Sequence, residues 1–194
     1  FDTFVWICVA HFKYNKDYQT LFKAMELLKD RKIRLDIIGN LHGARWPLEV
    51  IKKNQLQHKI RLLGQLQTPQ EHFRNANAFV LSSFSEGMPN AVLEAMANSK
   101  PVVLSDIECN EELVLEAKCG FLFERGNEVD LAHKMTEVME LSQKERTLLG
   151  RSGRRHIEEN FSEQKVMKDW LKVIDDLSSV PSIGRAHLTP ACTS

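Results

Sequence analysis

The chain alternates between short apolar runs and longer amphipathic stretches. Short apolar runs are typical of strands buried on both faces of a parallel sheet, whereas apolar residues three and four apart are typical of helices. The runs predict strands over Phe4–Ala10, Leu35–Ile38, Ile60–Leu63, Ala78–Leu81, Val102–Leu104 and Gly120–Phe123. Helices are predicted over Tyr18–Leu28, Pro47–Lys53, Pro69–Arg74, Asn90–Ala97, Val129–Leu141, Gln143–Glu159 and Glu163–Leu177, with a helical turn or two over Glu111–Leu115. This alternation indicates an α/β fold with a doubly wound, Rossmann-like parallel sheet of about six strands.

Local signals support these boundaries and suggest one domain. Asp17 and Ser162 stand where each can cap the helix that follows it. The segment 178–194 shows no hydrophobic period, so we expect it to be a disordered tail. We therefore predict one domain over residues 1–177.

Composition and charge narrow the class of protein. Hydrophobic residues make up 43% of the 194 residues, as in a globular domain, and 26 basic residues balance 26 acidic ones. A main role in nucleic-acid binding is unexpected without a basic excess. No apolar run reaches membrane-spanning length, and the sequence starts at Phe1, almost directly with a strand. We expect a cytoplasmic protein and a piece of a longer chain.

The cysteines and histidines suggest neither a disulfide framework nor a metal centre. The four cysteines (Cys8, Cys109, Cys119 and Cys192) include no CxxC pair, and the seven histidines show no metal-binding spacing. We expect a reducing compartment, no cofactor and no metal.

Polar and glycine-containing segments follow the predicted strands. In a parallel α/β sheet, ligands bind beyond the carboxyl ends of the strands. We therefore expect one rim built from five segments: His11–Lys16, Gly39–Gly43, Gly64-Gln65, Ser82–Glu86 and Ser105–Glu112.

The stretch around Pro89 predicts a strand, a tight turn and a helix start. Pro89 suits the first helical position, and the amides of Asn90, Ala91 and Val92 are then expected to be free to bind an anion. Glu94 lies in the same helix among apolar residues, so we expect a buried carboxylate that needs a partner. Alone, these features are equally typical of an ordinary capped helix with an internally paired acid.

Two glutamates in this stretch carry a family resemblance. Glu86 and Glu94 are separated by seven residues within EGMPNAVLEAMA, and KPVVLSD and Glu112 follow. The pattern resembles the group-1 GT-B glycosyltransferases, which use a nucleotide-diphospho-sugar and retain the anomeric configuration. The resemblance runs from about Val5 to Phe161 and implies the C-terminal, donor-binding half of a GT-B fold.

The resemblance implies roles for individual residues. It places the donor's diphosphate and sugar against the backbone of Gly87, Met88, Asn90 and Ala91. It sets Glu86, otherwise a solvated turn acid, against the sugar hydroxyls, where it would stabilise the charge at the anomeric carbon. Glu94 would accept hydrogen bonds from the ribose. Further donor-binding positions are implied for Lys16 and His11 on the diphosphate, Gln65 and Leu66 near the base, and Glu112.

Two departures from the family pattern affect the same site. His11 stands where the family usually has an arginine, so donor affinity is expected to be weaker, or to rise as pH falls. Glu108-Cys109 replaces a usual pair of glycines, and this extra acid would repel a diphosphate unless it points away.

The expected function follows from the resemblance. The parent enzyme would transfer a sugar to a hydroxyl acceptor in surface polysaccharide or glycolipid synthesis, without a catalytic metal. An N-terminal acceptor domain, absent from this sequence, would complete the site, and a lipid-linked acceptor would place the enzyme at the inner membrane surface. Open alternatives are a nucleotide-sugar epimerase, a degenerate domain that only binds partners, and a flavodoxin-like or regulator domain.

Overall fold

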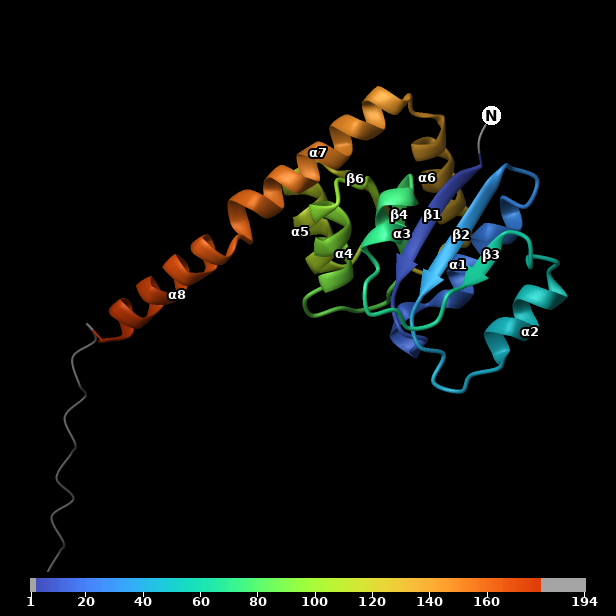
Figure 1. Cartoon of the computed structure of the whole chain (residues 1–194), viewed down its shortest axis with the longest axis horizontal. Coiled ribbons are helices and arrows are strands. Elements are labelled where there is room, and N and C mark those ends of the chain that lie inside the picture. Colours follow the sequence, from blue (N-terminus) through green and yellow to red (C-terminus); the bar gives the residue numbers. More distant parts are fainter. Residues whose placement is uncertain (1–2, 179–194) are drawn as a thin grey trace, which may run out of the picture. The chain divides into compact units, whose positions relative to one another are not determined.

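A computed structural model describes residues 3–178. Between Glu158 and Glu159 the chain divides into two compact units. The predicted six-stranded, wholly parallel sheet is confirmed, with the strand order β3-β2-β1-β4-β5-β6 (Figure 1). The strands are β1 (Phe4–Val9), β2 (Ile33–Ile38), β3 (Ile60–Leu62), β4 (Ala78–Leu81), β5 (Val102–Ser105) and β6 (Gly120–Phe123).

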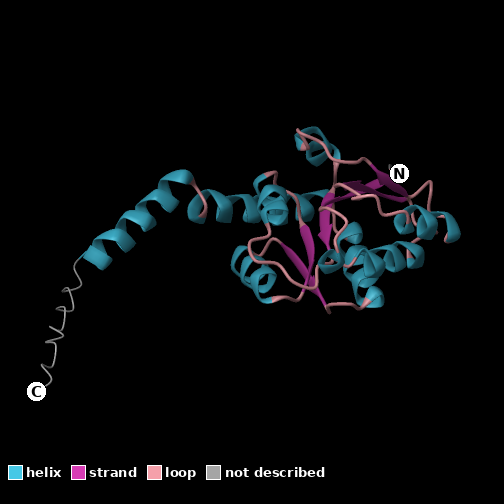
Figure 2. Ribbon diagram, turned by 90° about the horizontal axis from the view of Figure 1, so that it is seen from below, coloured by secondary structure: helices cyan, strands magenta, loops and turns pink. Residues whose placement is uncertain are grey.

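Helices cover both faces of this sheet, as Figure 2 shows. The α-helices of the described residues are α1 (Tyr18–Leu27), α2 (Trp46–Lys53), α3 (Gln70–Asn75), α4 (Asn90–Ala97), α5 (Glu108–Ala117), α6 (Glu128–Glu140), α7 (Gln143–Asn160) and, in the second unit, α8 (Glu163–Ser178). Parallel strands joined by right-handed crossovers place α1 and α2 on one face and α3, α4 and α5 on the other. The strand order reverses at β1 and β4, and in such sheets this point is where ligands bind.

Most predicted helices are confirmed, with two differences near the carboxyl edge. The helix that we expected to be a turn or two is α5, ten residues long. A 3-10 helix (η1, Tyr14–Lys16) was not predicted, and Asp17 follows it in the left-handed conformation with a φ of 43°. The Asp17 side chain caps α1 as predicted, because its Oδ1 accepts a 3.3 Å hydrogen bond from the Thr20 amide.

Strand β2 contains one buried charged residue, Asp36, among mostly apolar residues. The Asp36 side chain is 5% exposed and accepts hydrogen bonds from the guanidiniums of Arg34 and Arg61, at 3.0 Å and 2.7 Å to Oδ1. Although burial opposes its charge, the bonds from Arg61 and Arg34 hold the pKa of Asp36 below its usual value. Because both guanidiniums are paired with it, Asp36 can stay charged although it is buried in β2, next to the edge strand β3.

At the amino edge of the sheet, α7 packs closely against residues just before β5 and β6. An added Cβ at Gly150 of α7 would lie 1.9 Å from the Ser99 carbonyl oxygen, and one at Gly153 would lie 2.9 Å from the Cys119 Cβ. Only glycine permits the helix to approach this closely.

The second unit contains α8, whose helical wheel separates apolar and charged residues. The predicted cap is confirmed by a 3.4 Å bond from the Lys165 amide to the Ser162 Oγ. Val166, Met167, Trp170, Val173 and Ile174 are exposed along the apolar side. The predicted disordered tail and Cys192 lie outside the described residues, apart from residue 178, which ends α8.

Candidate functional site

A cavity of about 550 Å³ opens where the strands end at their carboxyl edge. The loops after β1, β2, β3 and β4 all contribute to its wall. The wall contains every predicted site residue except Gly87 and Glu112: His11, Lys16, Gln65, Leu66, Glu86, Met88, Asn90, Ala91 and Glu94. The convergence expected from chain order is therefore present for four of the five segments, and the Ser105–Glu112 segment is absent from the cavity wall.

Lys16 and Glu86 form an ion pair in the cavity wall. The Lys16 Nζ donates to the Glu86 Oε1, and the Ser83 Oγ donates to the same oxygen at 2.5 Å. The Lys16 and Glu86 side chains are only 18% and 9% exposed. Glu86 is thus not the solvated turn acid that its position alone would suggest, because its carboxylate is held beside a cation at the edge of the cavity.

Helix α4 presents its first turn and Glu94 to the cavity. Contrary to our expectation, Glu94 is exposed, because α4 meets the open rim at this point of its turn. Two of the three amides expected to be free are engaged: Asn90 donates to the Met88 carbonyl at 2.9 Å and Val92 donates to the Pro89 carbonyl at 2.8 Å. Among the described residues the Glu94 carboxylate has no hydrogen-bond or ion-pair partner, so a ligand can bind it without displacing one.

His11 is held in one tautomer by the loop after β2. The backbone amide of Asn40 donates to the His11 Nδ1 at 3.0 Å, and a backbone amide can only donate. Nδ1 therefore carries a lone pair, and the ring proton of the neutral imidazole is on Nε2. The Asn40 side chain links the neighbouring loop, since its Nδ2 donates to the Gln65 Oε1 at 3.4 Å.

The two remaining predicted residues, Gly87 and Glu112, are not part of the cavity wall. Gly87 has no heavy atom within 4 Å of an added Cβ, so open space adjoins its backbone. Glu112 is exposed on α5, and Glu108 is exposed at the start of the same helix, so the extra acid does not line the cavity. The Cys109 Sγ donates to the Glu86 carbonyl at 3.7 Å. Burial, followed by the charge of Glu86, raises the pKa of the Cys109 thiol, which favours this protonated donor.

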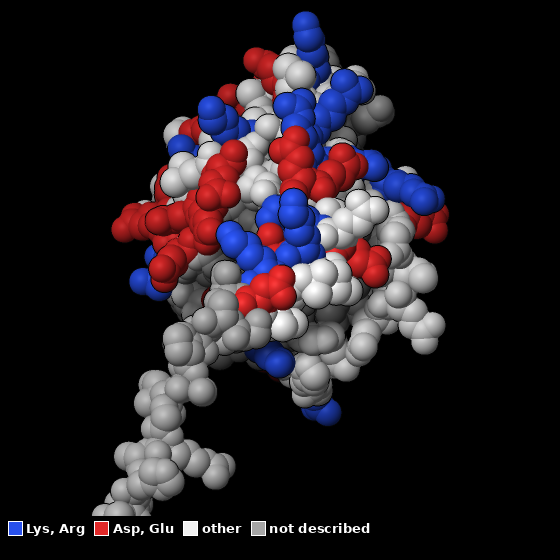
Figure 3. Space-filling model, turned by 90° about the vertical axis from the view of Figure 1, so that its left-hand side faces the viewer, with Lys and Arg blue, Asp and Glu red and all other residues white. Residues whose placement is uncertain are grey.

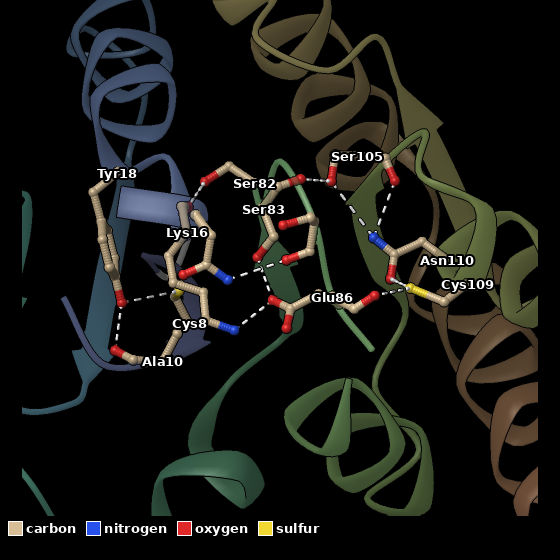
Figure 4. Close-up of polar contacts among 12 residues, drawn as sticks. Cys8, Ala10, Lys16, Tyr18, Ser82, Ser83, Glu86, Ser105, Cys109 and Asn110 are labelled. Carbon is tan, nitrogen blue, oxygen red and sulfur yellow. Dashed lines mark hydrogen bonds and ion pairs between the residues drawn. The ribbon is translucent and has the colours of Figure 1, made fainter. Parts of the chain in front are cut away.

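The structure also identifies site residues that the sequence did not indicate. Ser83, Ser105 and Asn110 are completely buried and are hydrogen-bonded beneath the Glu86 turn (Figure 4). The sequence held one signal for them. Ser82 and Ser83 directly follow the apolar run of β4, and polar side chains that are buried at such a position need hydrogen-bond partners.

Within residues 3–178, no cluster of three or more His, Cys, Asp or Glu side chains is arranged to hold a metal ion. The same part of the chain has no helix that is both long and apolar enough to cross a bilayer. Both acidic and basic side chains lie at the surface (Figure 3), in keeping with the 26 basic and 26 acidic residues of the sequence.

A doubly wound parallel sheet with a cavity at its carboxyl edge defines a Rossmann-like domain. Residues 2–156 match the model of the family described as glycosyl transferases group 1. Because this match covers most of the chain, the protein belongs to that family, and the resemblance inferred from the two glutamates is confirmed.

Known relatives agree with this assignment. The chain is 25% identical over 171 residues to the capsular polysaccharide biosynthesis glycosyltransferase CapM of Staphylococcus aureus, covering 87% of this chain and 45% of CapM. It is 27% identical over 176 residues to the N,N'-diacetylbacillosaminyl-diphospho-undecaprenol alpha-1,3-N-acetylgalactosaminyltransferase of Campylobacter jejuni, covering 88% and 45%. The chain thus spans less than half the length of these curated relatives.

Solved structures show the same fold. A variant of S. aureus TarM, in complex with fondaparinux, alpha-GlcNAc-glycerol and UDP, superposes with a TM-score of 0.80 at 24% identity. The superposition covers 90% of this chain and 36% of TarM. The fold class predicted from the sequence, a Rossmann-like half of a GT-B architecture, is therefore confirmed.

Proposed function

We propose that this chain binds the nucleotide-diphospho-sugar donor of a retaining glycosyltransferase. The observation that carries the proposal is the cavity at the carboxyl edge, where Lys16, Glu86 and Glu94 reach one space from two different loops and a helix. A cation, a buried carboxylate and an exposed carboxylate match the diphosphate, the sugar hydroxyls and the ribose hydroxyls of such a donor.

The proposed binding mode assigns one part of the donor to each group. The diphosphate lies between Lys16 and the first turn of α4, where the helix dipole favours negative charge. His11 adds an N–H donor from Nε2, because its Nδ1 accepts from the Asn40 amide. The two ribose hydroxyls donate to the exposed Glu94. Gln65 and Leu66, at the far wall, are the candidates for contact with the base.

Glu86 acts at the sugar. Its carboxylate accepts hydrogen bonds from the sugar hydroxyls and stabilises the positive charge that develops at the anomeric carbon as the bond to phosphate breaks. A carboxylate that is already in place costs no reorganisation at that moment, which is where electrostatic catalysis is most effective.

The acceptor is bound elsewhere in the proposed enzyme. This chain spans less than half of relatives that are named for capsular polysaccharide synthesis and for a polyprenol-diphosphate-linked acceptor. We propose a hydroxyl acceptor of this kind, a surface glycan or a lipid-linked saccharide, on a further N-terminal domain. The chain alone should then bind donor but transfer little sugar. Rapid transfer by the chain alone would contradict this division of labour.

Ligand-observed NMR tests donor binding directly. The chain is mixed with UDP, GDP, ADP and their sugars at pH 6 and pH 8. We expect one nucleotide series to bind, with the sugar-bearing form competing for the same site as the bare nucleotide, and to lose binding in Glu94→Ala. If no nucleotide binds at millimolar concentration, or if Glu94→Ala binds as well as the original chain, the proposal is wrong.

A further inference from the structure

The Glu86 carboxylate receives two donors on a single oxygen. Lys16 Nζ and Ser83 Oγ both donate to Oε1 (Figure 4), and neither donates to Oε2. The Glu86 backbone carbonyl is a third point of attachment, because it accepts from the Cys109 Sγ at 3.7 Å. Oε1 is thus the anchored oxygen, and Oε2 is left for another partner.

The two hydrogen-bond donors, Lys16 and Ser83, have different roles once the nucleotide-sugar binds. In the proposed function, on which this inference rests, Lys16 turns its charge to the diphosphate. A phosphate oxygen competes directly with Oε1 for the Lys16 ammonium, since both are anionic acceptors. Ser83 has no comparable alternative, because its hydroxyl is buried beneath the turn and does not line the cavity.

Ser83 is itself held by a chain of buried polar groups. Its carbonyl accepts a 2.6 Å hydrogen bond from the Ser105 Oγ at the end of β5. The Asn110 Nδ2, in the first turn of α5, donates to the Ser105 carbonyl at 3.0 Å. The adjacent Ser82 is bonded to the other side, where its Oγ donates to the carbonyls of Lys16 and Asp17 at 2.9 Å and 3.0 Å. A buried hydrogen-bonded network of this kind limits the freedom of the groups that it joins.

We propose that Ser83 is a positioning residue, whose hydroxyl keeps the Glu86 carboxylate at the sugar position while Lys16 is engaged by the diphosphate. Ser105 and Asn110 hold Ser83 in place from β5 and α5. Loss of the Ser83 hydroxyl should therefore affect the sugar-bearing ligand and spare the bare nucleotide.

The binding test compares two adjacent serines. Isothermal titration calorimetry gives the Kd of the bare nucleotide and of its sugar for the original chain, for Ser83→Ala and for the matched control Ser82→Ala. We expect Ser83→Ala to weaken the nucleotide-sugar about tenfold and the nucleotide less than about twofold, because one hydrogen bond to a charged group is lost. Ser82→Ala should leave the ratio of the two Kd values unchanged. Equal weakening of both ligands by Ser83→Ala, or no weakening, would overturn the proposal.

A second measurement does not depend on any ligand. Lys16→Met imitates the loss of the ammonium to a diphosphate, and crystal structures of Lys16→Met and of the double variant Lys16→Met/Ser83→Ala show where Glu86 lies. We expect the carboxylate to stay on the Ser83 hydroxyl in the single variant and to leave its position in the double variant. A carboxylate that swings away in Lys16→Met alone contradicts the role of Ser83, whether or not a nucleotide binds.

Discussion

The two edges of the sheet use their charged groups in opposite ways. The amino edge has the larger hollow, about 940 Å³, lined by the cations Arg31, Lys32, Lys100 and Arg146 among other residues. Lys100 donates to the carbonyls of Arg74 and Ala76 at 3.3 Å and 2.7 Å, and burial lowers its pKa. Arg146 donates to the carbonyls of Met139 and Leu141. These two cations are bound to the backbone around them.

The smaller cavity at the carboxyl edge is built differently. Glu94 and His11 are exposed in its wall, and the Lys16–Glu86 pair joins side chains from two loops. Side chains that converge on a shared space can exchange their partners for a ligand, whereas Lys100 and Arg146 would have to leave backbone carbonyls without a partner. The two edges therefore differ in how their polar groups are engaged, and not only in volume.

The largest expected effect compares the close packing around Gly150 at the amino edge with the open space beside Gly87 at the carboxyl edge. Gly150→Ala places a Cβ 1.9 Å from the Ser99 carbonyl oxygen, so the free energy of unfolding should fall by about 3 kcal/mol or more. The matched change Gly87→Ala meets no atom within 4 Å and should alter it by less than about 0.5 kcal/mol. Urea unfolding followed by circular dichroism measures both. Similar losses in the two variants would remove the contrast.

The second effect concerns the exposed carboxylate of the cavity. Glu94→Ala should weaken nucleotide binding about 10-fold to 100-fold, since the ribose hydroxyls lose a charged acceptor. Glu111→Ala removes an exposed glutamate of α5 that does not line the cavity, and it should leave the Kd unchanged. Calorimetry on both variants measures the difference. If Glu111→Ala weakens binding as much, general surface charge rather than the cavity attracts the nucleotide.

The third effect concerns a charge that is fully engaged within the sheet. Asp36→Asn should lower the free energy of unfolding by about 1–3 kcal/mol at pH 7, because two guanidiniums lose their carboxylate. The folded-state pKa of Asp36 is below its unfolded value, so the stabilisation is present above the unfolded pKa and is lost as pH falls through the folded pKa.

Urea unfolding of the original chain and Asp36→Asn, measured from pH 7 down to pH 3, should therefore show a difference that shrinks with acidification. The exposed Asp30→Asn is the control and should show little difference at any of these pH values. A difference for Asp36→Asn that stays constant across this range would mean that the stabilisation does not come from the charge.

The smallest expected effect tests whether Glu112, outside the cavity wall, contacts the nucleotide. The family resemblance assigns Glu112 to donor binding, yet this residue is exposed on α5 and lies outside the cavity wall. On this geometry Glu112→Ala should change the nucleotide Kd by less than about threefold, which is under 1 kcal/mol. Calorimetry measures the nucleotide Kd of Glu112→Ala and of Glu94→Ala under the same conditions. A loss as large as that of Glu94→Ala would show that the β5 exit closes onto the ligand.

The sequence by itself determined the strands, most of the helices and the edge of the sheet at which the cavity lies. A buried parallel strand must be apolar on both faces, and a covering helix must be apolar along one stripe, so both leave a local signal. The first turn of α5 left a weaker one, because Glu108 and Glu111 are exposed there and its buried residue Asn110 is polar. The 3-10 helix η1 has only three residues, Tyr14–Lys16, which is too short for a hydrophobic period, so the sequence did not predict it.

Only the tertiary structure decided which groups within the site meet. Lys16 and Glu86 are 70 residues apart and come together because β1 and β4 are neighbours in the sheet. The exposure of Glu94, the tautomer of His11 and the anchoring of Glu86 by Ser83 depend on where α4 and the loops after β1, β2 and β4 come to rest. Hydrogen bonds act over about 3 Å, and the path of the chain between two residues sets that distance, while the sequence pattern records only which face each residue occupies.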